Sequence, residues 1–152
     1  MSDKASQPFI SKDKNFIITF NGEIYNYKEI KKDLIQKNIL FKSNSDTEVI
    51  VEAYKYWGLE SLKRFRGMFS FAIWDIKKHK LILARDPLGI KPLYYTNKNG
   101  VIYFASQIKS LLSIDGINFK KNETSIVSFY IWGNEQDPFT LYSDINSVEK
   151  GT

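Results

Sequence analysis

The sequence predicts one α+β domain in which strands are sandwiched between helices. Short apolar runs typical of strands alternate with segments that carry apolar residues at helical spacing behind capping residues. No internal repeat, low-complexity tract or linker divides the chain. Of its 152 residues 43% are hydrophobic and 15% aromatic, which is enough for one core, and a net charge of only +5 argues against disorder.

Composition also excludes several kinds of site. Cysteine is absent and His79 is the one histidine, so the sequence offers no disulfide, no thiolate or His-cluster metal site and no cysteine nucleophile. His79 lies among lysines, which is typical of a solvated turn. No apolar run approaches the ~20 residues of a membrane span. Residues 1–8 contain no apolar signal region, so we expect a cytoplasmic protein without membrane contact. The scattered lysine pairs form no basic stripe, and we expect no nucleic-acid partner.

The first half of the chain predicts one strand followed by helices. The apolar run over 15–20 predicts a strand that Asn21-Gly22 ends, and Asn26 with Glu29 predicts a capped helix start. The further elements expected here are a loop over 1–14, a helix that starts at a capping box of Ser45 and Glu48 and ends at Gly58, and a short helix over 59–64.

The second half begins with strands. Residues 68–74 and 81–84 are almost wholly apolar, which predicts strands buried on both faces and joined by a polar turn over 75–80. Residues 93–96 and 101–104 predict a further hairpin. Helices are expected over 107–112 and 123–132.

Asn21-Gly22-Glu23 is the first candidate for chemistry. Asn-Gly is the favoured pair of a two-residue hairpin turn, but a helix cap and not a return strand follows it. The other interpretation is an oxyanion hole. In it, the Asn21 amide is one donor and Gly22 lets its backbone N–H approach a reacting carbonyl. The tripeptide alone leaves both interpretations open.

Two carboxylates also have alternative roles. Asp46 favours a helix N-terminus electrostatically. Because Ser45 can do the capping, the Asp46 carboxylate is also a candidate to hold a ligand ammonium. Asp86 follows Arg85 in a loop rich in Pro and Gly, which predicts a tight loop with a local Arg–Asp pair.

Five motifs follow one another along the chain. They are Phe20-Asn-Gly-Glu-Ile-Tyr-Asn-Tyr27, Ser45-Asp-Thr-Glu48, Arg66-Gly-Met-Phe-Ser-Phe-Ala-Ile-Trp-Asp75, Ala84-Arg-Asp86 with Gly89-Ile-Lys-Pro-Leu-Tyr-Tyr95, and Phe104-Ala-Ser106. In this order they resemble the asparagine synthetase version of the class II glutamine amidotransferase signature. The resemblance covers most of residues 15–112, and a looser match continues to Gly151.

The resemblance implies an N-terminal-nucleophile hydrolase fold, an αββα sandwich of two antiparallel sheets between helices. It implies a glutaminase that releases ammonia from glutamine. Asn21 and Gly22 then resemble the oxyanion hole, Glu23 and Asp46 resemble ligands of the amino-acid end of glutamine, and the Asp86-to-Lys91 loop resembles scaffold beside the site.

The chain departs from the family at both ends. Family members begin with a cysteine nucleophile, and neither it nor the Arg-containing segment that grips the glutamine carboxylate is found here. We therefore expect residues 1–152 to be a partial glutaminase domain without its opening strands, which leaves apolar surface and a strand edge uncovered. The ATP loop of the synthetase domain is also not found, so ATP and magnesium are expected only for that absent domain, and no cofactor or metal for this chain.

Three functional classes follow from this resemblance. In the first, the chain is a glutaminase unit that serves asparagine synthesis or the amidation of another carboxylate, such as a sugar acid. Such a unit is expected to be inactive alone because it has no cysteine. Alternatively it is a non-catalytic module that binds glutamine or a partner, or a fragment without an independent role. An N-terminal Ser2 nucleophile is a further alternative. Expected partners are weakly bound L-glutamine, a synthetase domain, the missing N-terminal segment or a second copy.

Overall fold

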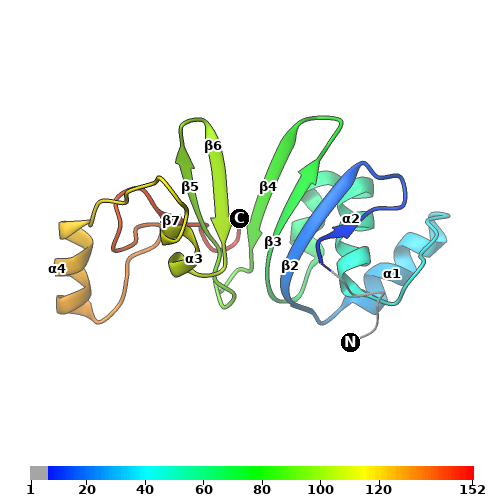
Figure 1. Ribbon diagram of the computed structural model, residues 1–152. Coiled ribbons are helices and arrows are strands. Elements are labelled where there is room, and N and C mark those ends of the chain that lie inside the picture. Colours follow the sequence, from blue (N-terminus) through cyan, green and yellow to red (C-terminus); the bar gives the residue numbers. More distant parts are fainter. Residues whose placement is uncertain (1–6) are drawn as a thin grey trace.

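The computed structural model describes residues 7–152, whose strands form two antiparallel sheets (Figure 1). The elements are β1 (Phe9–Ile10), β2 (Phe16–Ile24), α1 (Tyr27–Gln36), α2 (Asp46–Trp57), the 3-10 helix η2 (Gly58–Arg64), β3 (Gly67–Asp75), β4 (Lys80–Arg85), β5 (Tyr94–Lys98), β6 (Val101–Ala105), α3 (Ile108–Leu112), α4 (Glu123–Trp132) and β7 (Asn146–Ser147). One sheet has the order β1-β2-β3-β4 and the other the order β6-β5-β7.

The layers follow one another across the molecule. Figure 1 shows α1 and α2 against one face of the four-stranded sheet, then the three-stranded sheet, with α3 and α4 beyond it. The prediction of two antiparallel sheets between helices is confirmed. Both hairpins, the helix that Gly58 ends and the helix over 123–132 also form where the sequence predicts them. Ser2 lies outside the described residues.

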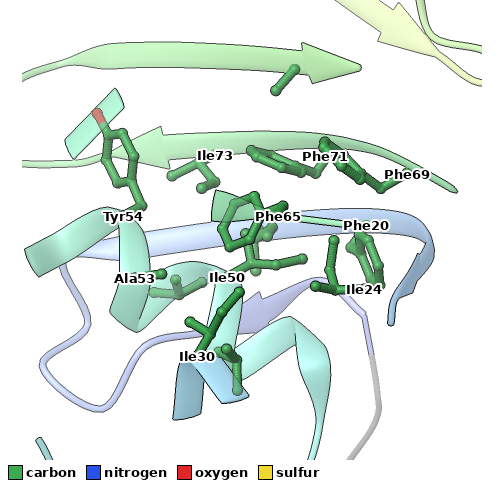
Figure 2. Packing of buried hydrophobic residues seen from close by; sticks show 14 of the residues in the cluster. Phe20, Ile24, Ile30, Ile50, Ala53, Tyr54, Phe65, Phe69, Phe71 and Ile73 are labelled. Atoms are coloured by element: carbon green, nitrogen blue, oxygen red, sulfur yellow. The ribbon is translucent and has the colours of Figure 1, made fainter. Parts of the chain in front are cut away.

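The main core lies between the four-stranded sheet and α2 (Figure 2). Alternate residues of β2 and β3 point to this face, because successive side chains of a strand point to opposite sides. Phe65, Phe69 and Phe71 form an aromatic group at its centre, with ring centroids 5.8–6.3 Å apart. Each buried ring contributes about 1.5–3 kcal/mol through removal of apolar surface from water. This core makes β2 and β3 the rigid support of the candidate site.

Strand β2 is longer than predicted. It does not end before Asn21 but runs to Ile24, with Gly22 opposite Phe69 of β3. Gly22 has φ 139°, and a Cβ on it would lie 2.8 Å from the Phe69 Cα and would collide with the Met68 carbonyl oxygen. Asn-Gly therefore marks a close approach of two strands here and not a turn. The dipeptide alone does not separate the two cases, because Gly serves both in turns and where backbones meet closely.

The helix starts are held differently from the predicted caps. Ser45 does cap α2, accepting from the Thr47 N–H at 3.2 Å. Glu48 does not complete a capping box, because its carboxylate accepts from the N–H groups of Lys42 and Ser43 at 2.9 and 2.7 Å. It thereby fixes the loop before α2.

Asn26 stands at the start of α1 but makes no side-chain cap. Its amide instead donates to the Arg64 carbonyl and accepts from the Arg66 N–H, both at 2.9 Å. The predicted capping pair with Glu29 is therefore wrong. A contact across 38 residues of sequence replaces it and ties the start of α1 to the segment that enters β3.

The second face of the four-stranded sheet is only partly covered, which corrects the prediction of strands buried on both faces. Trp74 is 36% exposed, and Leu81 and Leu83 are half-buried. An apolar groove of about 470 Å³ separates this face from the β5–β6 hairpin. Residues that line the groove include Ile17, Thr19, Ala72, Trp74, Leu81, Val101, Ile102 and Phe104. A run of apolar residues indicates that both faces of a strand avoid water. It does not show that another element of the fold covers each face.

Within residues 7–152, no helix has both the length and the apolar character needed to cross a membrane.

Candidate functional site

A cavity of about 320 Å³ lies between the two sheets, at the part of β2 that precedes Asn21. Asn21 lines it, together with residues of β3, of β6 and of the segments next to them. Ile18, Phe20 and Ile24 of β2 are buried in the main core, so alternation turns Asn21 to the opposite face, toward the cavity. The other lining residues are Gln7, Thr19, Phe20, Ser70, Phe71, Ala72, Leu93, Phe104, Ala105 and Ser106.

Gln7 holds β2 immediately before Asn21. Its amide donates to the Phe20 carbonyl and accepts from the Phe20 N–H, each at 2.7 Å. A paired contact of this kind satisfies both backbone groups of one residue and fixes the strand there. Sequence reasoning missed Gln7, because no local pattern indicates a partner 13 residues away.

Glu23 is exposed two residues beyond Asn21, on the same side of β2. Gly22 lies between them, in the close contact with β3 described above. Neither Gly22 nor Glu23 is among the residues that line the cavity. The strand thus presents Asn21 at the wall of the cavity and Glu23 beyond it, at the strand's end, and both residues are exposed.

Asp46 reaches the same end of β2 from the N-terminus of α2. One carboxylate oxygen accepts from the Ile24 N–H at 3.3 Å and the other from the Thr47 N–H at 2.9 Å. Asp46 therefore takes the role at the helix N-terminus that its position predicts, and each of its carboxylate oxygens already has a backbone partner. Asp46 joins α2 to the residue after Glu23, so the two acidic residues belong to one corner, although Asp46 does not line the cavity.

Asp86 is the central residue of the loop after β4. It is fully buried, and it accepts from the N–H groups of Leu88, Ile90 and Lys91 at 3.0 Å and of Phe69 at 3.3 Å. Burial by itself raises the pKa of the Asp86 carboxyl, but these backbone donors outweigh it and hold the pKa below its usual range. Because Phe69 pairs with Gly22, Asp86 braces the strand beside the candidate site.

Arg85 does not pair with Asp86, contrary to the expected local pair. Its guanidinium donates to the carbonyls of Gly89 at 2.6 Å, Lys91 at 3.0 Å and Val148 at 3.1 Å, and to the Asp137 carboxylate at 3.4 Å. It therefore ties the Asp86 loop to the C-terminal part of the chain. In residues 7–152, no three acidic or histidine side chains are grouped to hold a metal ion.

Comparison with known proteins places the chain in a family. A profile described as a glutamine amidotransferase domain matches residues 1–152. The chain belongs to this family. Over 150 residues it is 39% identical to asparagine synthetase [glutamine-hydrolyzing] 1 of Bacillus subtilis, a match that covers 99% of this chain and 24% of that protein. Asparagine synthetase [glutamine-hydrolyzing] 2 of the same organism is 50% identical over 107 residues, which are 70% of this chain and 14% of that protein.

The resemblance to the asparagine synthetase group is thus confirmed, and the chain spans at most about a quarter of these two relatives. Among solved structures, the glutamine phosphoribosylpyrophosphate amidotransferase of B. subtilis matches with a TM-score of 0.61 and 26% identity, over 72% of this chain and 26% of that one. An allosteric regulatory enzyme of purine biosynthesis matches with a TM-score of 0.59 over 96% of this chain and 31% of that one, and at 20% identity it supports the fold alone. The fold of the amidotransferase family is therefore present here.

Proposed function

We propose that this amidotransferase domain provides the glutamine-binding and oxyanion-stabilising part of a glutaminase that supplies ammonia for amide formation. One observation supports the proposal most strongly: Asn21 lines the cavity between the sheets, at the corner where Glu23 and Asp46 also lie. The names of its relatives support asparagine formation as the reaction served. Another acceptor carboxylate, such as that of a sugar acid, is the alternative.

Each site residue has a distinct role in this proposal. The Asn21 amide and the Gly22 N–H donate to the oxygen of the glutamine carboxamide, where negative charge develops during attack. Glu23 and Asp46 accept from the ammonium group of glutamine, and charge-assisted hydrogen bonds of this kind are short and strong. Gln7 and Asp86 act by holding β2 and β3 in place.

The covalent step needs a nucleophile, and the 152 residues include no cysteine that could provide it. A cysteine thiol from another segment would attack the carboxamide carbon, and its proton would pass to the departing nitrogen so that ammonia leaves. Water would then cleave the thioester, which releases glutamate and returns the thiol. ATP and magnesium would belong to the part that activates the acceptor. The absence of cysteine from these residues favours a second candidate function, glutamine binding without turnover.

Glutamate release tests both functions. The purified 152-residue polypeptide with glutamine should release no glutamate, because removal of the nucleophile leaves only positioning and oxyanion stabilisation. Co-expression with a cysteine-bearing N-terminal segment of an asparagine synthetase should restore release, and Asn21→Ala should reduce it by about 100-fold or more.

The control substitution for Asn21→Ala is Asn99→Ala in the β5–β6 turn, which should leave the restored release unchanged. Release by the polypeptide alone that survives Ser2→Ala would contradict the proposal, whereas release abolished by Ser2→Ala would support a serine nucleophile. A folded complex with full release in Asn21→Ala would remove Asn21 from the site.

A further inference from the structure

The apolar groove of about 470 Å³ beside the β5–β6 hairpin leads into the cavity at Asn21. Thr19, Ala72 and Phe104 line both spaces, so the groove and the cavity adjoin each other between the sheets. The groove borders the first residues of β6, and the cavity borders its last residues. One continuous space therefore runs beside β6 and ends at Asn21.

The groove also exposes a free strand edge. Strand β6 lies at the edge of its sheet and contains neither a charged residue nor proline. Val101 and Ile102 are neighbours on the strand and point to opposite faces of the sheet, yet both line the groove, and they are 49% and 47% exposed. The groove therefore reaches around the edge of β6, where unpaired backbone groups can accept a further strand.

We propose that the groove holds the segment that supplies the cysteine, as a strand added to the free edge of β6. This inference rests on the proposed function, which needs a thiol at the carboxamide beside Asn21. A strand placed along β6 follows the one space that the groove and the cavity share, so its end lies at Asn21.

The groove also defines the chemistry of this segment. Every residue that lines the groove is uncharged, and Ile17 and Trp74 of the four-stranded sheet form part of its wall. The side chains of the added strand that face this wall should therefore be apolar, at every second position. A cysteine at the start of the segment lies at the Ser106 end of β6, and the added strand then runs antiparallel to β6.

Two other exposed surfaces do not lead to the site. A cavity of about 770 Å³ lies beside β1, but Lys12, Lys14 and Lys42 line it, and it shares no lining residue with the cavity at Asn21. The exposed apolar side chains of α4 lie at the end of the molecule farthest from α1, and none of them lines that cavity (Figure 1). A segment bound to either surface would not bring its thiol to Asn21.

Co-purification tests where the segment binds. The 152-residue polypeptide would be co-expressed with a tagged, cysteine-bearing N-terminal segment of an asparagine synthetase. The two should purify together, and they should still do so when the cysteine of the segment is changed to serine, because binding does not need the thiol. Ile102→Lys in β6 should reduce the co-purified polypeptide at least tenfold, because it places a charge in an apolar groove.

Ile10→Lys is the matched control, because Ile10 is a 52% exposed isoleucine on β1, the edge strand of the four-stranded sheet. This variant should bind the segment as the natural sequence does. Circular dichroism should show the same folded spectrum for both variants, so that a loss of binding reports on the groove and not on unfolding.

Disulfide formation tests the direction of the added strand. Because the natural sequence has no cysteine, Ser106→Cys introduces a single thiol at the wall of the cavity. Mild oxidation should link it to the cysteine of the segment. Asn99→Cys, in the turn at the opposite end of β6, should stay unlinked.

Three results would overturn the proposal: no co-purification with the natural sequence, a loss of binding in Ile10→Lys but not in Ile102→Lys, or a disulfide with Asn99→Cys and not with Ser106→Cys. Glutamate release separates this inference from the proposed function. Binding and cross-linking as expected without glutamate release would support the inference and contradict the proposed function. Restored release that Ile102→Lys leaves unchanged would support the proposed function and overturn the inference.

Discussion

Asp86 is the residue through which the loop after β4 supports the candidate site. A single carboxylate accepts from four backbone N–H groups, three in its own loop and one in β3. With the residue fully buried, these donors replace the water that the charge loses. The same contacts keep the carboxylate ionised and hold its pKa low. Asp86 therefore contributes to stability as an anion.

We predict that Asp86→Asn lowers the free energy of unfolding by about 2 kcal/mol or more at pH 7, because the amide keeps the shape but loses charge-assisted bonds. The folded pKa lies below the ordinary value of about 3.9, so this contribution is complete above that value and is lost as pH falls through the folded pKa. Urea unfolding would measure the free energy of unfolding of the natural sequence and of Asp86→Asn. The difference between the two values should narrow below about pH 4.

Asp33→Asn is the control, since Asp33 is exposed on α1 and surface changes usually stay within about 0.5 kcal/mol. An Asp86→Asn difference that is equal at pH 7 and pH 3 would show that the ionised carboxylate is not the stabilising form.

The sequence indicated some of these residues and not others. Asn21 and Asp46 stand in recognisable motifs, and both lie at the corner where β2 ends. The contact of Gln7 with Phe20 and that of Asp86 with Phe69 were not foreseeable, because these backbone partners lie 13 and 17 residues away, whereas the other three partners of Asp86 lie in its own loop. A hydrogen bond to a distant backbone group leaves no periodicity or local pattern.

Among the elements, those with local start and stop signals were predictable. Helix α2 ends at Gly58, and α4 has its own caps at Asn122 and Gly133. The end of β2 was not predictable, because its last residues are extended only through pairing with β3. The pairing in turn depends on glycine in both strands: a Cβ on Gly67 would collide with the Glu23 carbonyl oxygen.

The close contact of β2 with β3 predicts a large effect of one methyl group. Gly22→Ala should lower the free energy of unfolding by more than about 3 kcal/mol, because φ 139° is a backbone region nearly restricted to Gly and the Cβ meets the Phe69 backbone. Gly116→Ala is the matched control, with φ 75° and nothing within 4 Å of its Cβ, and should cost about 1–2 kcal/mol. Thermal and urea unfolding would measure both variants. If Gly22→Ala and Gly116→Ala lost the same free energy of unfolding, the β2–β3 contact would not be restrictive.

For the whole molecule, the sequence motifs predicted the layered arrangement better than periodicity did. Apolar runs predicted strands, but the order of two sheets between helices came from the resemblance to the amidotransferases. Periodicity also suggested that the second face of the four-stranded sheet is fully buried, whereas an apolar groove of about 470 Å³ borders it. How far the two sheets approach each other depends on contacts between segments remote in sequence, and local patterns do not report these.

The proposed glutamine site is the corner formed by Asn21, Glu23 and Asp46. None of the three arginines in the sequence lines the cavity, so the α-carboxylate of glutamine lacks a bidentate arginine partner there. A charge-assisted contact is worth about 1.5–3 kcal/mol, so without it we expect an affinity for glutamine no tighter than the millimolar range. Affinity of this order is best measured by NMR titration.

The most direct measurement is a ¹⁵N NMR titration of the 152-residue polypeptide with L-glutamine. We expect the largest shifts at the Asn21 side-chain amide and the Gly22 and Glu23 backbone amides. Asp46→Asn should weaken binding about tenfold or more, and the Asp33→Asn control should bind as the natural sequence does. Shifts centred elsewhere, or micromolar binding that Asp46→Asn leaves unchanged, would contradict this account of the site.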